Sequence, residues 1–328
     1  MVHTDFIPYT SWMRDISDSI PLTELSIPGT HNSGSIDGPF GFAQTQDLDL
    51  PDQLNAGIRF LDIRLAHYQN NIFVHHDIVH MKKSYADVLD ICSDFLRHHP
   101  AEVIFMSVKD ESRIDSVLGM FAPSEILNTV DEDPAEDPTD VTIESESINP
   151  GSFEGIFKAK TWQHVGNASL FYNFTSSRGE SGPETADHTP LFETKLGDVR
   201  GKIVLLRRFA GGRDIGLDLT YWPENQTFRR TTPLIHSVHD CYLGLGSGQK
   251  YELVVAHLEQ AKQGDPRDLY ITFASAVGLK ARGYAEEINS RLNDYLARSL
   301  KGRFGIIALD YFDQPRELVS HVIEMNYE

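Results

Sequence analysis

Short runs of Ile, Val, Leu and Phe alternate with segments of helical spacing along most of this chain. Four segments carry apolar residues three and four positions apart and predict helices, at Tyr85–His98, Gln249–Gln263, Arg282–Leu300 and Pro315–Met325. Eight apolar runs predict strands, at Leu25–Ile27, Arg59–Arg64, Ile72–His75, Val103–Val108, Ile203–Arg207, Leu234–Val238, Tyr270–Phe273 and Gly305–Leu309. Strands that alternate with helices favour a parallel sheet, and eight strands favour its closure into a barrel. We therefore expect an α/β fold, a single irregular TIM-type barrel domain over residues 1–328.

One region departs from this alternation. Residues 131–146 contain eight acidic residues, two prolines and no basic residue, and residues 176–190 are rich in Gly, Ser, Pro and Thr. Such a composition is typical of solvated linkers, and the acidic run lacks the spacing of an EF-hand metal loop. We predict a loop-rich acidic insertion at about residues 125–190, with ordered structure around Phe157–Phe174.

The balance of charge narrows the choice of ligand. The chain has 29 Lys and Arg against 48 Asp and Glu, a formal net charge of −19. Such a surface repels the phosphates of nucleic acids and gives no bulk attraction to anionic membranes. We therefore expect no nucleic-acid partner, and a phosphate-bearing ligand would need a local pocket of Arg, Lys or His side chains.

Cysteine content and apolar run lengths exclude further classes of protein. Cys92 and Cys241 are too few for a disulfide framework or a zinc site built from several cysteines. No run of about 18 apolar residues predicts a transmembrane helix. The stretch after Met1 lacks the basic and apolar regions of a signal peptide. We expect a cytoplasmic protein, or a secreted one if the chain is a mature form.

Polar side chains stand where the predicted strands end. In a barrel all these carboxyl ends meet at one face, where active sites lie, and grouped polar side chains over an apolar core are costly unless they serve a ligand. The predicted strand ends carry His31, Arg64, His76, Lys109, Arg208, Asp240 and Asp310.

These residue types suit the cleavage of a phosphodiester by an internal hydroxyl. Asp62 and Arg64 are two residues apart and therefore share one face of a strand. Arg64 could bind a phosphate there, with Asp62 as the carboxylate that orients it. Of the two imidazoles, His31 and His76, one could remove a proton and the other could donate one, while the fixed cation stabilises the phosphoryl oxygens. The residue types alone do not separate such an enzyme from a metal-free nuclease, but the net charge disfavours nucleic acid.

At these residues the chain resembles the bacterial phosphatidylinositol-specific phospholipases C, the X-domain family, over nearly its whole length. Nine stretches carry the resemblance in the same order along the chain. They are Trp12–Met13 together with Asp18–Pro21, then Ser26–His31, Phe60–Arg64, Val74–His76, Ile104–Lys109, Lys195–Leu206, Tyr221–Phe228, Val238–Tyr242 and Leu309–Tyr311.

The resemblance implies a role for each catalytic position. His31 is implied as the general base on the inositol 2-hydroxyl, with Asp310 as its carboxylate partner. His76 is implied as the general acid toward the diacylglycerol oxygen. Arg64 would stabilise the phosphate, and Asp62 would orient the basic groups. The implied products are diacylglycerol and inositol 1,2-cyclic phosphate.

The resemblance also implies the substrate contacts. Lys109, Arg208 and Asp240 are similar to residues that hydrogen-bond the inositol hydroxyls, and Tyr242 to one that packs on the ring. The implied partners are phosphatidylinositol or glycosyl-phosphatidylinositol lipids.

Asn32 departs from the bacterial pattern, which has Asp directly after the base histidine. An amide cannot relay a proton as a carboxyl group can. Asn at this place is instead similar to the calcium-dependent eukaryotic enzymes, which leaves a calcium-dependent phospholipase C as an alternative. Those enzymes have acidic ligands where this chain places Arg64 and Lys109, and two cations would repel Ca²⁺. We therefore expect no metal and no other cofactor.

The expected rim of the barrel is apolar rather than rich in Trp. Phe40, Phe42, Val277 and Leu279 are candidates for shallow insertion into a membrane, although the phenylalanines could equally cap the core. We expect transient peripheral membrane contact and a monomer.

Two other functions stay open at this point. A glycerophosphodiester phosphodiesterase can use the same barrel, but it needs an acidic metal site that Arg64 and Lys109 would disturb. A catalytically impaired lipid- or inositol-phosphate-binding protein is suggested by Asn32, but binding alone would not need both His31 and His76.

Overall fold

The structure, a computed structural model, describes a large part of the chain. The described residues are 9–36, 44–68, 70–76, 79–112, 152–165, 170–174, 189–212, 214–232, 234–276 and 281–327. The acidic run at 131–146 therefore lies outside the described residues, and so do the rim candidates Phe40, Phe42, Val277 and Leu279.

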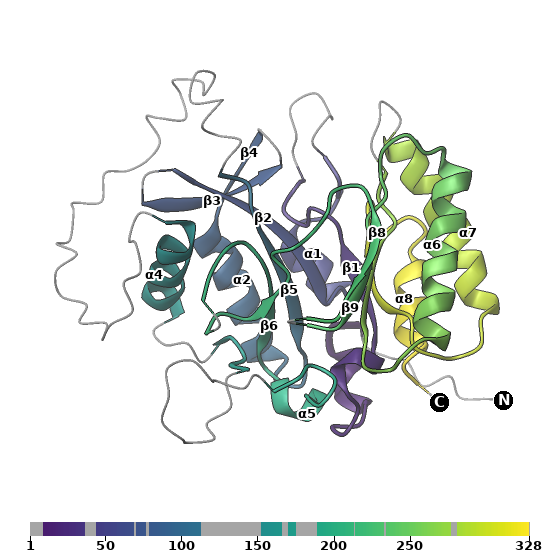
Figure 1. Cartoon of the computed structure of the whole chain (residues 1–328), viewed down its shortest axis with the longest axis horizontal. Helices are drawn as coiled ribbons and strands as arrows, with labels where there is room; N and C mark the ends of the chain where they lie inside the picture. The colour runs from purple at the N-terminus through teal and green to yellow at the C-terminus, as the bar shows by residue number, and fades with distance from the viewer. Residues whose placement is uncertain are drawn as a thin grey trace.

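One mixed sheet forms the centre of the molecule, and eight of its strands run parallel (Figure 1). In spatial order the strands are β7 (Leu217–Asp218), β6 (Ile203–Arg208), β5 (Ile104–Asp110), β2 (Phe60–Tyr68), β1 (Ser26–Thr30), β11 (Gly305–Leu309), β10 (Leu269–Phe273), β9 (His236–His239) and β8 (Thr227–Arg230). Strands β7 to β9 in this order are all parallel, and β8 adds an antiparallel edge. No ladder joins β7 to β8 among the described residues, so the sheet curls strongly without closing.

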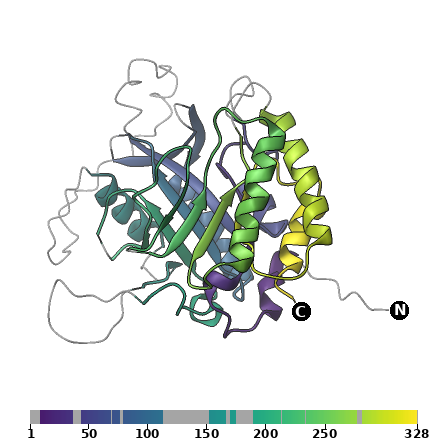
Figure 2. The same ribbon diagram turned by 45° about the vertical axis from the view of Figure 1, so that its right-hand side comes forward.

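Helices cover the outside of this sheet, as Figures 1 and 2 show. On one side lie α2 (Tyr85–His98) and α4 (Phe153–Val165), and on the other α6 (Ser247–Gln263), α7 (Ala281–Arg298) and α8 (Glu317–Glu324). The short helices are η1 (Tyr9–Asp15), η2 (Leu22–Glu24), α1 (Leu50–Asn55) and α5 (Leu196–Val199). None of the described helices combines the length and the apolarity that crossing a bilayer requires.

Helix α2 shows how local sequence produces these elements. Ser84 accepts a hydrogen bond from the backbone N–H of Asp87, and the Asp87 side chain accepts one from the backbone of Ser84. This reciprocal capping satisfies two N–H groups that a helix start leaves without partners. The helix then buries Val88, Leu89 and Cys92 against the sheet, as its helical spacing predicts.

The predicted strand at Ile72–His75 is correct as a strand but wrong as a member of the parallel barrel. Strand β3 (Asn71–His76) runs antiparallel to β2, and β4 (Val79–Ser84) continues this hairpin. A short connection between β2 and β3 allows only antiparallel pairing, since a parallel crossover needs a dozen or more residues. Strands β4, β7 and β8 were not predicted.

Two features bring β1 close to β2 near the expected site. Gly29 pairs with Phe60, and a Cβ atom on Gly29 would lie 2.6 Å from the Phe60 ring, so only glycine fits here. The next pair, Thr30 and Leu61, places His31, which follows the carboxyl end of β1, beside Asp62 of β2.

Candidate active site

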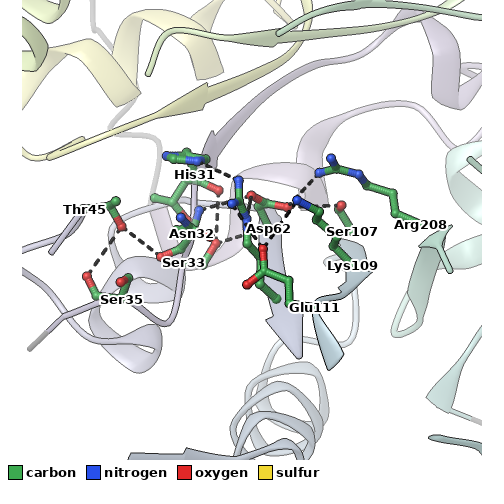
Figure 3. A network of polar contacts seen from close by, with 12 residues as sticks. His31, Asn32, Ser33, Ser35, Thr45, Asp62, Ser107, Lys109, Glu111 and Arg208 are labelled. Carbon is green, nitrogen blue, oxygen red and sulfur yellow. Dashed lines mark hydrogen bonds and ion pairs between the residues drawn. The ribbon is translucent and has the colours of Figure 1, made fainter. Parts of the chain in front are cut away.

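The carboxyl ends of several parallel strands gather polar side chains at the mouth of the curled sheet. The register pairs Arg64 of β2 with Lys109 of β5, and Lys109 with Arg208 of β6, so three cations form one row. His31 follows β1, and Asp310 follows β11, its neighbour in the sheet. Figure 3 shows His31, Lys109 and Arg208 around one polar network.

His31 lies between a carboxylate and a guanidinium. Its Nδ1 is 2.8 Å from Asp310 Oδ1, and its Nε2 is 2.9 Å from Arg64 Nη2. Because arginine stays protonated, Arg64 donates to Nε2, which therefore carries the lone pair. The ring proton is then on Nδ1 and is donated to Asp310. This tautomer is the one in which Nε2 can accept a proton from a substrate.

Asp62 is a fully buried carboxylate that organises the cations. Its oxygens lie 3.5 Å from Arg64 Nε and 3.5 Å from Arg208 Nη1. Ser107 Oγ and the backbone N–H of Asn32 each donate to it at 3.2 Å. Burial alone would raise the pKa of Asp62, but the nearby cations and these donors lower it to about 2. Asp62 is therefore an ionised anchor and not a proton donor near neutral pH.

Glu111 belongs to the same network, although the sequence analysis did not identify it. It is 2% exposed, and its Oε1 lies 3.4 Å from Arg64 Nη1 and 3.5 Å from Lys109 Nζ. Its backbone N–H donates to Leu65 of β2. A signal was present, because Lys109 and Glu111 are two residues apart and therefore point to the same face of an extended segment.

Arg208 forms part of a second wall with Trp222 and Asp240. Its guanidinium lies 3.7 Å from the centre of the Trp222 ring, a cation–π contact. The indole N–H of Trp222 donates to Asp240 Oδ2 at 2.7 Å. This arrangement places a cation on the face of the indole ring and a carboxylate at its N–H edge, and both groups can hydrogen-bond a polyhydroxylated ring.

Tyr242 and Glu224 continue this wall toward Lys109. The Tyr242 hydroxyl donates to Glu224 Oε2 at 2.8 Å, and Lys109 Nζ is 3.4 Å from Glu224 Oε1. Burial and the Glu224 charge raise the pKa of Tyr242 to about 12, so it remains a neutral donor. Trp222 and Glu224 were not predicted as site residues, although both lie within the stretch Tyr221–Phe228 that carries the family resemblance.

Asn32 is the residue of this site with an unusual side-chain environment. It is 2% exposed, and neither its Oδ1 nor its Nδ2 has a hydrogen-bond partner among the described residues. Its φ of 43° lies in the left-handed region, which Asn tolerates better than most residues. A buried amide without partners is costly, and a bound ligand beside His31 would supply the missing contacts.

The segment Gln44–Asp47 joins the loops that carry His31 and Asp310. The side chain of Gln46 donates to the carbonyl oxygens of His31 (2.9 Å) and Leu309 (2.8 Å). Thr45 donates to the Asn32 carbonyl, and its own carbonyl accepts from the Tyr311 backbone. These hydrogen bonds fix the backbone of the two loops that carry His31 and Asp310. Nothing in the local sequence pattern predicted them.

His76 is placed only through its backbone. It ends β3, which runs back along β2 so that Val74 pairs with Leu65, the neighbour of Arg64. The hairpin therefore returns the chain toward Arg64, but the side chain of His76 lies outside the described residues. Its role as the acid stays a prediction.

The donor set does not fit a calcium ion. Asp62 and Glu111, the carboxylates nearest the centre of the network, each contact the guanidinium of Arg64, and Glu111 also contacts Lys109. A dication here would face two fixed positive charges. No group of three or more His, Cys, Asp or Glu side chains in the described ranges forms a metal-binding cluster.

Three groups of this site, the imidazole, the guanidinium and the second wall, can together cleave a phosphodiester. An imidazole with a free lone pair can remove a hydroxyl proton, a guanidinium can stabilise charge on phosphoryl oxygens, and the second wall can hold a polar ring.

Comparisons with known proteins find a family and relatives that this chain resembles. Residues 18–129 match the family model described as "Phosphatidylinositol-specific phospholipase C, X domain". The 1-phosphatidylinositol phosphodiesterase of Staphylococcus aureus strain Newman is 29% identical over 339 aligned positions, which cover 96% of this chain and 94% of that relative. The protein of the same name from Listeria monocytogenes is 26% identical over 334 positions, covering 96% of this chain and 84% of the relative.

Solved structures show the same architecture. A crystal structure of phosphatidylinositol-specific phospholipase C from Staphylococcus aureus superposes with a TM-score of 0.74 and 26% sequence identity, covering 98% of both chains. Another structure of the staphylococcal enzyme concerns the modulation of its membrane binding. The predicted fold class, an irregular TIM-type barrel, is confirmed, and so is the resemblance inferred from the sequence.

Proposed function

We propose that this protein, whose residues 18–129 belong to the phosphatidylinositol-specific phospholipase C X-domain family, cleaves the glycerol–phosphate bond of phosphatidylinositol. The observation that carries the proposal is the placement of His31 between Asp310 and Arg64. The pair supplies an oriented base directly beside a phosphate-binding cation. Relatives along 96% of the chain are 1-phosphatidylinositol phosphodiesterases, which supports the choice of substrate.

The first step forms a bond within the substrate. Nε2 of His31 removes the proton of the inositol 2-hydroxyl, and the oxygen attacks phosphorus. Asp310 stabilises the imidazolium that results, as a buried carboxylate on Nδ1 does in other acid–base pairs. Arg64 stabilises the negative charge on the phosphoryl oxygens, with Asp62 and Glu111 holding its guanidinium in place.

The second half of the step releases the lipid. The bond from phosphorus to the glycerol oxygen breaks, and that oxygen takes a proton from His76. The products are diacylglycerol and inositol 1,2-cyclic phosphate, so the hydroxyl proton lost to His31 is balanced by the one that His76 supplies. Asn32 would donate a hydrogen bond near the leaving oxygen, where a carboxyl group could relay the proton.

Headgroup recognition would fall to the second wall. Lys109, Arg208 and Asp240 would hydrogen-bond the inositol hydroxyls, and Tyr242 would pack on the ring. Trp222, together with Glu111 and Glu224, joins this set on the geometry described above, because each contacts one of these residues.

The remaining properties follow as parts of the proposal. The substrates are phosphatidylinositol or glycosyl-phosphatidylinositol lipids, reached by transient peripheral contact with the membrane. Phe40, Phe42, Val277 and Leu279 are the proposed contacts. We further propose a monomer that needs no metal and no other cofactor and that does not bind nucleic acid.

A product assay in excess EDTA tests reaction class and metal dependence together. We expect the protein to convert phosphatidylinositol in mixed micelles to the cyclic phosphate, seen as a new phosphorus NMR signal, at the same rate with and without EDTA. Loss of activity in EDTA that Ca²⁺ restores would favour the calcium-dependent alternative. The absence of product from a folded sample would favour a lipid-binding protein without activity.

Asn32→Asp should raise turnover several-fold. The position is buried and its side chain has no hydrogen-bond partner within the part of the chain that the structure describes, so burial would raise the pKa of the new carboxyl group and keep it partly protonated. A protonated carboxyl group there could pass a proton toward the leaving oxygen. Steady-state rates over a range of pH, with thermal unfolding of both proteins, measure the effect. An unchanged or lower rate would show that the site is built around the amide.

A further inference from the structure

Lys250 of α6 is a fully buried cation behind the second wall of the site, which Arg208, Trp222 and Asp240 form. It is 0% exposed. Its Nζ donates to the carbonyl oxygen of Cys241 at 2.6 Å and lies 3.2 Å from His239 Nε2. A buried ammonium is costly unless it is hydrogen-bonded, and no salt bridge joins Lys250 to a carboxylate within the part of the chain that is described. Its hydrogen-bond partners are therefore an uncharged carbonyl and an imidazole.

The imidazole partner is neutral and is itself held in place. Burial, Lys250 and His257 lower the pKa of His239 to about 2. Since the ammonium can only donate, Nε2 of His239 accepts from it, and the ring proton on Nδ1 is donated to Thr227 Oγ1 at 2.7 Å. The chain of bonds thus runs from β8 through β9 to α6.

The two residues that Lys250 binds flank Asp240. His239 and Cys241 point away from the site because neighbouring side chains in an extended segment alternate between faces. Asp240, between them, accepts from the Trp222 indole at 2.7 Å on the other face. One ammonium therefore holds the side chain of the residue before Asp240 and the backbone carbonyl of the residue after it, on both sides of a proposed headgroup contact.

We propose that Lys250 is a positioning residue for recognition of the inositol headgroup, acting through His239 and the Cys241 carbonyl on Asp240. This inference rests on the proposed function. It assigns a role to a residue outside the space where the reaction occurs, and it predicts an effect on substrate binding rather than on the chemical step.

The electrostatics of Lys250 agree with this role. Burial lowers its pKa to about 8, although attraction to Asp240, the Cys241 sulfur and Asp310 opposes that shift. The ammonium thus interacts with two carboxylates that border the site. Below pH 8 it is charged and donates to both of its partners. At higher pH it loses a proton, and its hydrogen bonds to His239 and to the Cys241 carbonyl weaken.

Lys250→Met is the direct test, because Met fills a similar volume without a donor. The affinity for myo-inositol, measured by calorimetry, should fall about tenfold, and KM for phosphatidylinositol in mixed micelles should rise about tenfold, since a misplaced contact loses binding, while kcat changes less than about twofold. Lys158→Met is the matched control. Lys158 is another buried lysine, on α4, and its Nζ is 3.0 Å from Glu154 and 2.9 Å from Asp214. Its replacement should leave both constants unchanged.

A pH profile and a conservative variant separate positioning from a general loss of structure. In the wild type, KM should rise as the pH passes about 8, and Lys250→Arg should keep a low KM and remove this rise because Arg stays charged. The groups that face Lys250 are His239, Asp240, Cys241, His257 and Asp310. Circular dichroism and thermal unfolding establish that each variant is folded.

The proposal is overturned if folded Lys250→Met keeps wild-type KM and inositol affinity, or if kcat falls as far as KM rises. If Lys250→Met does not fold, a Lys250→Arg profile that still rises above pH 8 overturns it. A wild type that releases no cyclic phosphate would refute the proposed function instead, while the calorimetric comparison would still report on positioning.

Discussion

His31→Ala and His76→Ala should each lower the turnover of phosphatidylinositol by about 10⁴-fold, the upper range for loss of a general base or acid. For His31 the reason is structural: Asp310 orients the ring through a 2.8 Å contact to Nδ1, and the Nε2 lone pair lies 2.9 Å from Arg64 Nη2, beside the proposed phosphate site. For His76 the reason is the proton that the leaving oxygen requires. Initial rates of cyclic phosphate release measure both effects.

The control for His31 is another histidine–carboxylate pair. His164 on α4 lies 2.6 Å from Asp90 through its Nε2, far from the site in sequence and on the outer face of the sheet. His164→Ala should leave the rate unchanged. If either His31→Ala or His76→Ala retained a rate within tenfold of the wild type while folded, that residue would have no part in the proton transfers.

Arg64→Met should lower turnover by about 10³-fold, the loss expected when one fixed donor to a developing oxyanion is removed. Arg64→Lys should recover only part of this. A lysine keeps the charge, but it cannot donate in parallel to the phosphate while also contacting Asp62 and Glu111, as the forked guanidinium can. We expect the fall to appear mainly in kcat, because the charge on phosphorus develops in the transition state.

Arg229 provides the matched control for Arg64. It also binds a carboxylate through two nitrogens, Asp268 at 2.5 and 2.8 Å, but it lies on the edge strand β8. Arg229→Met should change stability modestly and leave kcat as it is. A folded Arg64→Met protein with wild-type kcat would exclude the guanidinium from transition-state stabilisation.

The parallel strands and the long helices were predictable because their signals are local. Helix α2 has the bounds that its spacing predicts, since an apolar stripe and a capping Ser84 define it together. Strands β2, β5 and β6 carry mostly apolar stretches that lead to Arg64, Lys109 and Arg208. Because parallel strands end at one face, the row of cations followed from the fold class alone.

The rest depends on contacts between distant segments. The antiparallel turn of β3 was missed because an isolated apolar run does not state the direction in which it pairs. Gln46 reaches two carbonyl oxygens that are remote in sequence, and such a contact leaves no periodic trace. Glu111 and Trp222 stand beside predicted residues, but their roles depend on the side chains that surround them.

The contact between Arg64 and His31 has a consequence for selectivity. As long as nothing is bound, the guanidinium covers the only atom of the imidazole that can take a proton. A neutral polyol carries no charge that could attract the Arg64 guanidinium away from His31. A phosphodiester does carry such a charge, on the phosphoryl oxygens of the group that reacts. A phosphodiester substrate thus frees Nε2 of His31 as it binds, whereas a neutral alcohol leaves this atom covered by Arg64.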